Sequence, residues 1–374
     1  MILNEQEKIN WLRLSRTETV GPITFHRLLA KYGTATKALE ILPILTKNKP
    51  IKICDVATAE QELEILTKHK GQMIFAGDTN YPVALSSLED APPVLSVFGS
   101  LEILNKRSIA LVGSRNASLN GRKLAHKMAA DLGQQNMVIV SGLARGIDTA
   151  AHEGGLATGT IAVVAGGVDI VYPRENTDLY KNICESGAVV SECAWGMQPL
   201  AQHFPKRNRI VAGLSAGTVV IEANLRSGSL ITARMAAEQG RDVMAVPGFP
   251  LDPRSEGTNA LIRDGVTLVR DAADVMEQIG SFLKPREKTQ QISFSEIVGL
   301  ADEGLSDIAA NDSYSTENLY TLILPELSST PVEVDEIVRV CNLRSADVQG
   351  TLLEMELEGV VQRLPGNRVC LVNG

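Results

Sequence analysis

The stretch Ile109-Ala-Leu-Val-Gly-Ser-Arg115 sets the pattern from which the fold can be predicted. Its apolar residues run without polar alternation and end at a glycine, as in a strand that is buried on both faces of a sheet. The same pattern returns downstream at residues 137–140, 161–165, 188–191, 218–221 and 243–246. We therefore expect six buried strands between residues 109 and 246.

The segments between these strands have helical spacing and end at glycine, as residues 121–133 and 229–240 illustrate. Strand–helix repetition of this kind predicts an α/β fold with an extended, Rossmann-like, doubly wound and mostly parallel sheet. We assign this domain to residues 71–280. In such folds the carboxyl ends of the strands gather along one edge, and ligands bind there.

Smaller domains are expected on both sides of the sheet. Residues 1–70 read as short helices broken at Val20-Gly21-Pro22, which indicates a small domain of the SAM or helix-hairpin-helix kind. A helix–glycine–helix unit can hold a DNA phosphate on its amides. A helical bundle that only packs on its neighbour is the interpretation we favour. Residues 281–317 are polar and read as a linker.

The last segment, residues 318–374, predicts a winged-helix-like domain. Helices are expected over residues 320–327, 332–340 and 345–358, followed by a hairpin that turns at Pro365-Gly366-Asn367. Such domains often bind duplex DNA with their third helix. Here that helix is acidic, and an acidic helix is a poor partner for phosphates. We therefore favour a structural or protein-contact role for it.

Composition narrows the classes of partner. The formal net charge of the 374 residues is -8, so an anionic partner must be met by a local basic patch. The five cysteines contain no CxxC pair, and neither disulfides nor a metal or other cofactor is expected. No apolar run is long enough to span a bilayer, and a reducing cytoplasm is the expected location.

Glycine, serine and arginine follow several of the predicted strands. They include Ser114 with Arg115, Gly142 with Arg145, and the segment 226–229. Glycine allows the backbone to approach a ligand, and the helix that follows points its free amides at the same place. Arginine adds a planar fork that matches phosphate oxygens. These segments together predict a row of anion pockets along one edge of the sheet.

The segment His203-Phe-Pro-Lys-Arg-Asn-Arg209 is the most informative. Its three cations can neutralise phosphates, and Phe204 or His203 can stack on an unpaired base. Cations at the start of a helix oppose the helix dipole, so their presence is better explained if an anion binds there.

Catalytic and nucleotide-binding motifs fit poorly. Residues 113–118 do not match GxGxxG, and no P-loop is present. Asp148 lies near a predicted helix start, where we favour ordinary capping over an Asp–His pair with His152. Glu222 ends a strand and is the one carboxylate that we keep as a candidate catalytic group.

Six segments together closely resemble the DprA/Smf family of DNA-processing proteins. They are YPVALSSLEDAPPVL (81–95), GSR (113–115), SGLARGIDTAAH (141–152), GGVDIVYPREN (166–176), HFPKRNRIVAGLS (203–215) and VVIEANLRSGSLITA (219–233). The resemblance implies a protein without enzymatic activity that binds single-stranded DNA, protects incoming strands during natural transformation and loads the RecA recombinase on them. It also implies a homodimer that pairs through the Rossmann-like domain.

The positions that match the family's motifs imply ten DNA contacts. They are Ser114, Arg115, Gly142, Arg145, Phe204, Lys206, Asn208, Arg209, Ser227 and Gly228. Asn208 and Arg209 could instead brace the pocket from within.

Two alternatives stay open. The chain also resembles the Lonely-guy nucleotide phosphoribohydrolases, whose motif is PGGxGTxxE. Gly217-Thr218 and Glu222 match this motif in part, with one more residue between them, but the Pro-Gly-Gly is missing. A nucleotide-binding or nucleotide-cleaving enzyme is therefore the second hypothesis. The third is a module that binds protein partners, mainly through residues 318–374.

Overall fold

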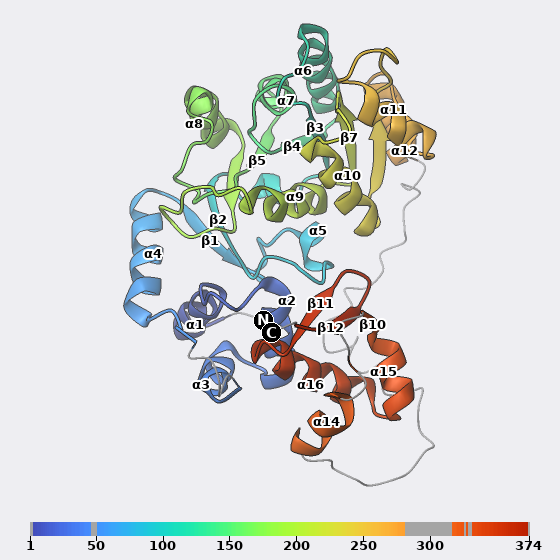
Figure 1. Ribbon diagram of the computed structural model, residues 1–374. Coiled ribbons are helices and arrows are strands. Elements are labelled where there is room, and N and C mark those ends of the chain that lie inside the picture. The colour runs from blue at the N-terminus through green and yellow to red at the C-terminus, as the bar shows by residue number, and fades with distance from the viewer. Residues whose placement is uncertain (1–2, 46–50, 281–315, 325–326, 328–330, 373–374) are drawn as a thin grey trace. The chain divides into compact units, whose positions relative to one another are not determined.

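The computed structural model describes residues 3–45, 51–280, 316–324, 327 and 331–372 (Figure 1). The chain divides into two compact units. The first contains the described residues of 1–26, 34–36 and 53–282, and the second contains those of 27–33, 37–52 and 283–374. Most of the expected linker, residues 281–315, lies outside the described residues. Its last two residues, Thr316 and Glu317, belong to a helix.

A nine-stranded sheet forms the centre of the first unit, in the order β1-β2-β6-β5-β4-β3-β7-β8-β9. Strands β3 to β9 pair in parallel, whereas β2 joins β6 and β1 in antiparallel fashion. The strands are β1 (Gln72–Phe75), β2 (Val94–Gly99), β3 (Ser108–Gly113), β4 (Val138–Ser141), β5 (Thr160–Val163), β6 (Ala188–Ser191), β7 (Gly217–Ile221), β8 (Asp242–Ala245) and β9 (Thr267–Leu268).

The predicted fold class is confirmed. Each of the six predicted strands is present, with ends that shift by at most two residues. The antiparallel strands β1 and β2 and the two-residue strand β9 were not predicted. Strands β1 and β9 form the two edges of the sheet, and β2 lies between β1 and β6.

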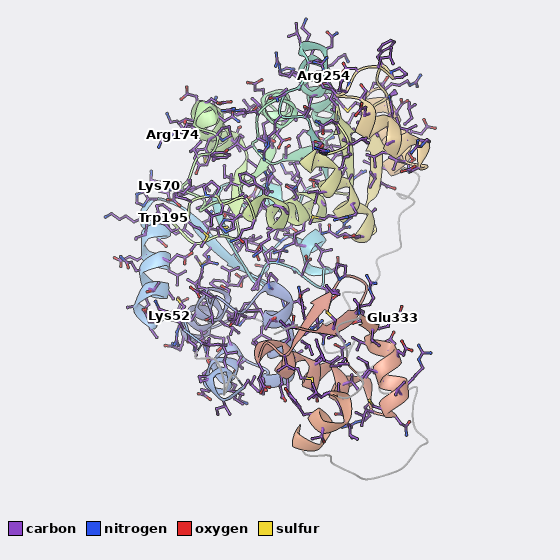
Figure 2. All side chains as sticks on the ribbon, in the orientation of Figure 1. Lys52, Lys70, Arg174, Trp195, Arg254 and Glu333 are labelled. Carbon is purple, nitrogen blue, oxygen red and sulfur yellow. The ribbon has the colours of Figure 1, made fainter. Side chains whose placement is uncertain are left out.

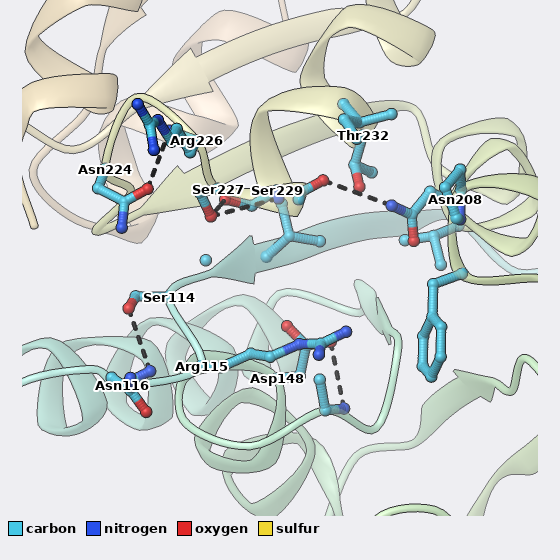
Figure 3. A pocket seen from close by; sticks show the side chains of 18 of the residues that line it. Ser114, Arg115, Asn116, Asp148, Asn208, Asn224, Arg226, Ser227, Ser229 and Thr232 are labelled. Carbon is cyan, nitrogen blue, oxygen red and sulfur yellow. Dashed lines mark hydrogen bonds between the residues drawn. The ribbon is translucent and has the colours of Figure 1, made fainter. Parts of the chain in front are cut away.

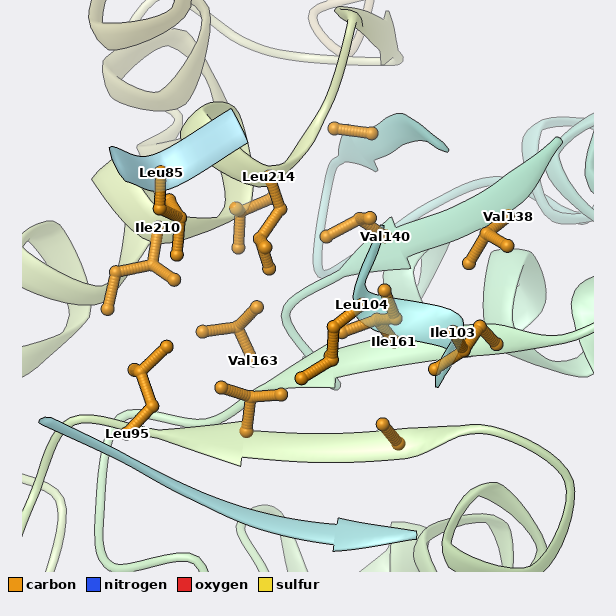
Figure 4. Packing of buried hydrophobic residues seen from close by; sticks show 14 of the residues in the cluster. Leu85, Leu95, Ile103, Leu104, Val138, Val140, Ile161, Val163, Ile210 and Leu214 are labelled. Carbon is orange, nitrogen blue, oxygen red and sulfur yellow. The ribbon is translucent and has the colours of Figure 1, made fainter. Parts of the chain in front are cut away.

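Helices cover both faces of the sheet (Figure 1). Alternate residues of β3 point to opposite faces, so Ala110 and Val112 join one apolar cluster while Ile109 and Leu111 join another. Figure 4 shows the first cluster, in which Ile210 and Leu214 pack beside Leu85, Val140 and Val163. The helices around the sheet are α5 (Val83–Ser86), η1 (Glu102–Asn105), α6 (Leu119–Gln134), α7 (Ile147–Gly155), η2 (Arg174–Asn176), α8 (Thr177–Ser186), α9 (His203–Leu214), α10 (Gly228–Glu238), α11 (Glu256–Arg263) and α12 (Ala272–Gly280).

The expected N-terminal helices are present as α1 (Glu5–Ser15), α2 (Pro22–Tyr32), α3 (Ala35–Leu45) and α4 (Val56–Lys68). Helix α2 begins at Pro22, as the fixed φ of proline favours, and is followed by Gly33 with a φ of 82°. Asn4 and Asp55 cap α1 and α4 by accepting hydrogen bonds from the amides of Glu7 and Thr58.

The second unit contains the winged-helix arrangement that was predicted. Helices α14 (Thr316–Ile323), α15 (Val334–Cys341) and α16 (Ser345–Leu357) accompany a sheet of β10 (Val332–Glu333), β12 (Arg368–Leu371) and β11 (Val361–Leu364). The hairpin turn is confirmed, with Gly366 and Asn367 both at positive φ. The helix predicted over 332–340 was wrong at its start, because Val332 and Glu333 pair with β12. The helix predicted over 320–327 begins earlier, at Thr316, and ends at Ile323.

The strand order creates a switch point between β3 and β7. After β3 the chain adds β4, β5 and β6 on one side, and it then returns to place β7 on the other side of β3. The loops that leave β3 and β7 therefore diverge at the carboxyl edge of the sheet. A doubly wound sheet has its ligand crevice at such a point.

Within the described ranges, no helix is long and apolar enough to cross a membrane.

Candidate nucleic-acid interface

A hollow of about 650 Å³ opens at the switch point between β3 and β7 (Figure 3). We call it the switch-point pocket. Its walls come from the loops after β3 and β7, the starts of α7, α9 and α10, and one residue of the loop after β8. The lining residues are Val112, Gly113, Ser114, Arg115, Asn116, Ala144, Asp148, Phe204, Pro205, Arg207, Asn208, Val211, Asn224, Arg226, Ser227, Gly228, Ser229, Ile231, Thr232 and Arg254.

Cations dominate the switch-point pocket. Guanidinium groups reach it from four segments of the chain, through Arg115, Arg207, Arg226 and Arg254. Arg254, labelled in Figure 2, lies on the loop between β8 and α11 and also pairs with Asp252 at 2.8 Å. Among the described residues that line the pocket, Asp148 is the single carboxylate. A chain with a net charge of -8 therefore concentrates positive charge at this place.

Aromatic rings stand at one wall of the pocket. The guanidinium carbon of Arg115 lies 5.1 Å from the centre of the Phe204 ring, a cation–π arrangement. The ring of Tyr172 meets Phe204 edge-on, with centroids 5.6 Å apart. Phe204 is half-buried and Tyr172 is 50% exposed, so this pair presents aromatic surface beside the cations.

Arg207 forms the floor of the pocket and is only 7% exposed. Its guanidinium lies over Gly142, where an added Cβ would come within 1.4 Å of Nη1. The buried Nε atom has no hydrogen-bond partner within the described part of the chain. The pKa of Arg207 is lowered to about 10, because burial outweighs the opposing charge of Asp148 and the charge of Arg115 adds to the decrease. The floor of the pocket is thus a charged group with unused hydrogen-bonding capacity.

Asp148 supports this floor from below. Its carboxylate accepts hydrogen bonds from the amides of Gly142 at 3.0 Å and Ala144 at 3.3 Å. Burial raises the pKa of Asp148, and the charge of Arg207 acts against that rise. These amides belong to the loop before α7, whose N-cap is Gly146 without a side-chain hydrogen bond, so Asp148 holds the loop and does not cap the helix as we expected from the sequence.

His152 is fully buried and forms a hydrogen bond with the same loop between β4 and α7. Its Nε2 accepts from the amide of Leu143 at 3.3 Å, and its Nδ1 lies 2.7 Å from the hydroxyl oxygen of Thr160. That hydroxyl donates to the carbonyl of Ile139, so it accepts from Nδ1. Burial, aided by Arg207, lowers the pKa of His152 to about 3. Both ring nitrogens of the neutral imidazole are therefore used in holding the loop.

The start of α10 closes the opposite wall. Ser227 caps the helix, accepts from the amide of Ser229 at 3.4 Å and shares a hydrogen bond with its hydroxyl at 2.7 Å. Asn208 donates to the carbonyl of Gly228 at 3.4 Å and so ties α9 to this turn. The positive end of the α10 dipole then faces a pocket already rich in arginine, a combination suited to an anion.

Six of the ten residues implied by the family resemblance line the switch-point pocket, namely Ser114, Arg115, Phe204, Asn208, Ser227 and Gly228. Gly142 is buried beneath Arg207. Lys206 is exposed on α9 between two lining residues. Arg145 lies in a different hollow and pairs with Glu175 at 2.6 Å.

Arg209 turns inward and is only 8% exposed. Its Nη2 pairs with Glu192 at 2.5 Å, and its Nη1 donates to the carbonyl of Asp90. Of the two roles expected for Arg209, the structure places the side chain in the bracing one. Arg226, which the sequence placed among the predicted anion pockets, lines the switch-point pocket, whereas sequence reasoning missed Arg254 and did not single out Arg207. The three cations of residues 206–209 were the available signal, but the sequence did not reveal which of them faces the pocket.

Glu222, the candidate catalytic carboxylate, caps helix α6 instead of lining the pocket. It accepts from the amide of Ser118 at 2.8 Å and from its hydroxyl at 2.5 Å. A Cβ at Gly121 would lie 2.5 Å from the Glu222 carboxyl carbon, so the helix start is shaped around this group. The described residues contain no group of three or more His, Cys, Asp or Glu that could hold a metal ion.

Comparison with known families supports the resemblance seen in the sequence. Residues 72–280 match the family described as DNA recombination-mediator protein A. Residues 5–64 match the DprA-like N-terminal HHH domain, and residues 309–367 match the DprA winged helix domain.

Individual relatives agree with these matches. The chain is 48% identical to DNA processing protein DprA of Streptococcus pneumoniae, over 54% of this chain and 72% of that protein. It is 36% identical to protein Smf of Escherichia coli, over 83% of this chain and 80% of the relative.

Two solved structures share the fold. The X-ray structure of DprA from Streptococcus pneumoniae aligns with a TM-score of 0.62 and 37% identity, covering 74% of this chain and 99% of that one. DNA processing protein A from Helicobacter pylori aligns with a TM-score of 0.52 and 28% identity, covering 57% of this chain and 96% of that one. The latter structure was described for its single-stranded DNA binding mode.

Proposed function

Because this chain belongs to the DprA/Smf family of DNA-processing proteins, we propose that it binds single-stranded DNA in the switch-point pocket. The observation that carries the proposal is the gathering of Arg115, Arg207, Arg226 and Arg254 in one hollow of an acidic protein. Phosphates are the anions that such planar forks bind best. The single-stranded DNA binding mode described for the Helicobacter pylori relative supports the same ligand.

An unpaired strand fits the pocket better than a duplex does. The Phe204 and Tyr172 rings stand beside the cations, and aromatic rings stack on bases only when the bases are unpaired. We assign the backbone phosphates to the four arginines and to the start of α10. Lys206, exposed on α9, adds charge at the rim.

We further propose what happens to the DNA strand after it has bound. The family description as recombination mediator supports transfer of the bound strand to the RecA recombinase, and a strand held in the pocket is shielded from nucleases. We propose that the protein acts as a homodimer paired through the Rossmann-like unit. We also propose that the pocket binds DNA without catalysing a reaction, because the carboxylates of Glu222 and Asp148 already accept hydrogen bonds from backbone amides.

The test is a fluorescence anisotropy titration with a labelled oligo-dT strand and with a duplex of the same length. We expect tight, salt-sensitive binding of the single strand by the wild type, and loss of that binding in the Arg115→Ala/Lys206→Ala variant. Arg234→Ala is the matched control. Its side chain is 73% exposed on α10 and lies outside the pocket lining, so this substitution removes one positive charge from the protein without altering the pocket.

Two outcomes would remove the proposal. Binding that the double variant leaves unchanged would place the DNA elsewhere, and a parallel loss of thermal stability would make the two residues structural. Incubation with a panel of nucleoside monophosphates tests the enzyme alternative. Release of free base, abolished by Glu222→Gln, would establish a phosphoribohydrolase instead.

A further inference from the structure

A second hollow, of about 490 Å³, lies between α6, the start of α7 and η2. Its charged lining comes from Arg122, Lys123 and His126 of α6, Arg145 before α7, and the carboxylates Glu153 and Glu175. Arg145, which the family resemblance implied as a DNA contact, therefore belongs to this hollow and not to the switch-point pocket.

The two hollows share a wall. Ala144 lines the switch-point pocket, whereas the next two residues, Arg145 and Gly146, line the second hollow. The loop after β4 packs directly on the loop after β3. The amide of Ile147 donates to the carbonyl of Ser114 at 3.2 Å, and a Cβ at Gly146 would come within 2.3 Å of that carbonyl oxygen. A strand that leaves the switch-point pocket over Arg115 therefore enters the second hollow next.

Positive charge prevails in the second hollow. Arg122, Lys123 and Arg145 are permanent cations against two carboxylates. Arg122 donates to the carbonyl of Ala117 at 3.2 Å, which fixes its position on the first turn of α6. Lys123 is exposed, lines the hollow and has no ion pair among the described residues. An anion can add to this group of cations without breaking a buried contact.

Arg145 carries an exchangeable partner. Its Nε lies 2.6 Å from one oxygen of Glu175, and its Nη2 donates to the other at 2.8 Å. Both side chains are more than half exposed, at 59% and 51%. An ion pair so open to water is weak and screened by salt. A phosphate can replace the carboxylate on the same two nitrogens with the same bidentate geometry.

On the basis of the proposed function, we infer that the second hollow binds phosphates of the same DNA strand as the switch-point pocket. Lys123, Arg122 and Arg145 hold these phosphates. Glu175 occupies Arg145 in the free protein and is displaced when the strand arrives. The strand thus spans two sites along the carboxyl edge of the sheet, and its affinity depends on whether it is long enough to reach both.

The test measures affinity against length, with oligo-dT strands of about 4 to about 20 nucleotides. Lys123→Ala is expected to bind the shortest strands as the wild type does and to weaken binding of long strands about two- to fivefold. The slope of log K against log salt for long strands is expected to fall by about 0.7 for the lost phosphate contact. Arg115→Ala is expected to weaken binding at every length.

Lys127→Ala is the matched control, because Lys127 lies one turn further along α6, pairs with Asp131 at 2.5 Å and does not line the hollow. It should bind all lengths as the wild type does. Glu175→Gln removes the competing carboxylate, so it is expected to strengthen binding of long strands about two- to fivefold and to leave short strands unchanged.

The outcomes separate this inference from the function on which it rests. If Arg115→Ala weakens binding but Lys123→Ala and Glu175→Gln match the wild type at every length, the second site is excluded while the first stands. If Lys123→Ala weakens short and long strands equally, the hollow is part of a single site and the inference also fails. If the wild type binds no strand, both proposals fall.

Discussion

At the scale of single residues, Arg207 is the group on which the switch-point pocket is built. It is buried, its Nε has no partner in the described part of the chain, and its charge is balanced from below by Asp148. A buried pair of this kind adds little net stability, but removal of one partner leaves an uncompensated charge. We infer that Arg207 is retained for the anion that it faces.

The Arg207→Met substitution tests this balance. It should lower the free energy of unfolding by about 3 kcal/mol, because Asp148 is left buried and alone. The double variant Arg207→Met/Asp148→Asn should recover most of that loss yet bind single-stranded DNA as weakly as the single variant. Urea unfolding and anisotropy measure the two properties separately. Recovery of DNA binding in the double variant would show that Arg207 only balances Asp148.

His152 gives the protein an acid-sensitive loop. The pKa of His152 is about 3 when folded, against an ordinary value near 6.5, because burial and the nearby charge of Arg207 disfavour the protonated ring. A base with a depressed folded pKa contributes stability that is present above pH 6.5 and lost as the pH falls towards 3. The loss should follow a slope of about 1.4 kcal/mol per pH unit.

The measurement is urea unfolding of the wild type and of His152→Gln between pH 7.5 and pH 5. Carboxylates contribute to both curves, so the difference between the curves isolates the histidine. The wild type should lose stability relative to the variant below pH 6.5. Parallel curves over this range would show that the pKa of His152 is the same in the folded and the unfolded protein.

At the scale of elements, the loop between β4 and α7 positions the floor of the pocket. Gly142 lies under the Arg207 guanidinium, and the loop has no room for a side chain there. This changes the interpretation of Gly142. The family resemblance implied a DNA contact, whereas the geometry gives this glycine the task of letting Arg207 lie flat.

Gly142→Ala should therefore displace Arg207 and weaken single-strand binding about tenfold, an effect of about 1.4 kcal/mol and within the range for overpacking. Gly21→Ala is the control, because it adds the same methyl group at an exposed glycine where a Cβ would meet nothing within 4 Å. Equal affinities of Gly142→Ala and the wild type would mean that the guanidinium has no fixed place in the complex.

Most strands of the sheet could be predicted from the sequence, because buried strands have a distinctive apolar composition. Six of the seven parallel strands were predicted, because their largely apolar composition marks them, as in Ala188–Ser191. Strands β1 and β2 were missed although β2 is largely apolar and buried, because residues 72–75 and 94–99 lie outside the strand–helix repetition that the prediction followed. Arg254 was missed because it comes from the loop after β8, which has no Gly-Ser-Arg turn.

The direction in which each side chain of a helix points is harder to predict from the sequence than the presence of the helix. Lys206, Arg207 and Arg209 lie within four residues at the start of α9, yet the structure exposes the first, buries the second in the pocket floor and pairs the third with Glu192. Each successive residue turns by about 100° around a helix. The direction of each charge therefore follows from how Ile210 and Leu214 dock on the sheet.

At the scale of the whole molecule, a net charge of -8 opposes any approach to DNA except at the basic hollows. If the four pocket arginines each neutralise one phosphate, the slope of log K against log salt should be about -2.8 for a single strand. Anisotropy titrations between 50 and 300 mM NaCl measure this slope. A slope near zero would show that phosphates do not contribute to binding.

The order of the strands also governs when the molecule becomes able to bind. Strand β7 is synthesised after β4, β5 and β6, yet it inserts beside β3, which left the ribosome much earlier. A nascent chain that ends at β6 carries Arg115 but neither the Arg226 loop nor the second wall of the crevice. DNA affinity is therefore acquired late in translation, after β7 has paired with β3 and the loops that carry Arg226 and Arg254 have been synthesised.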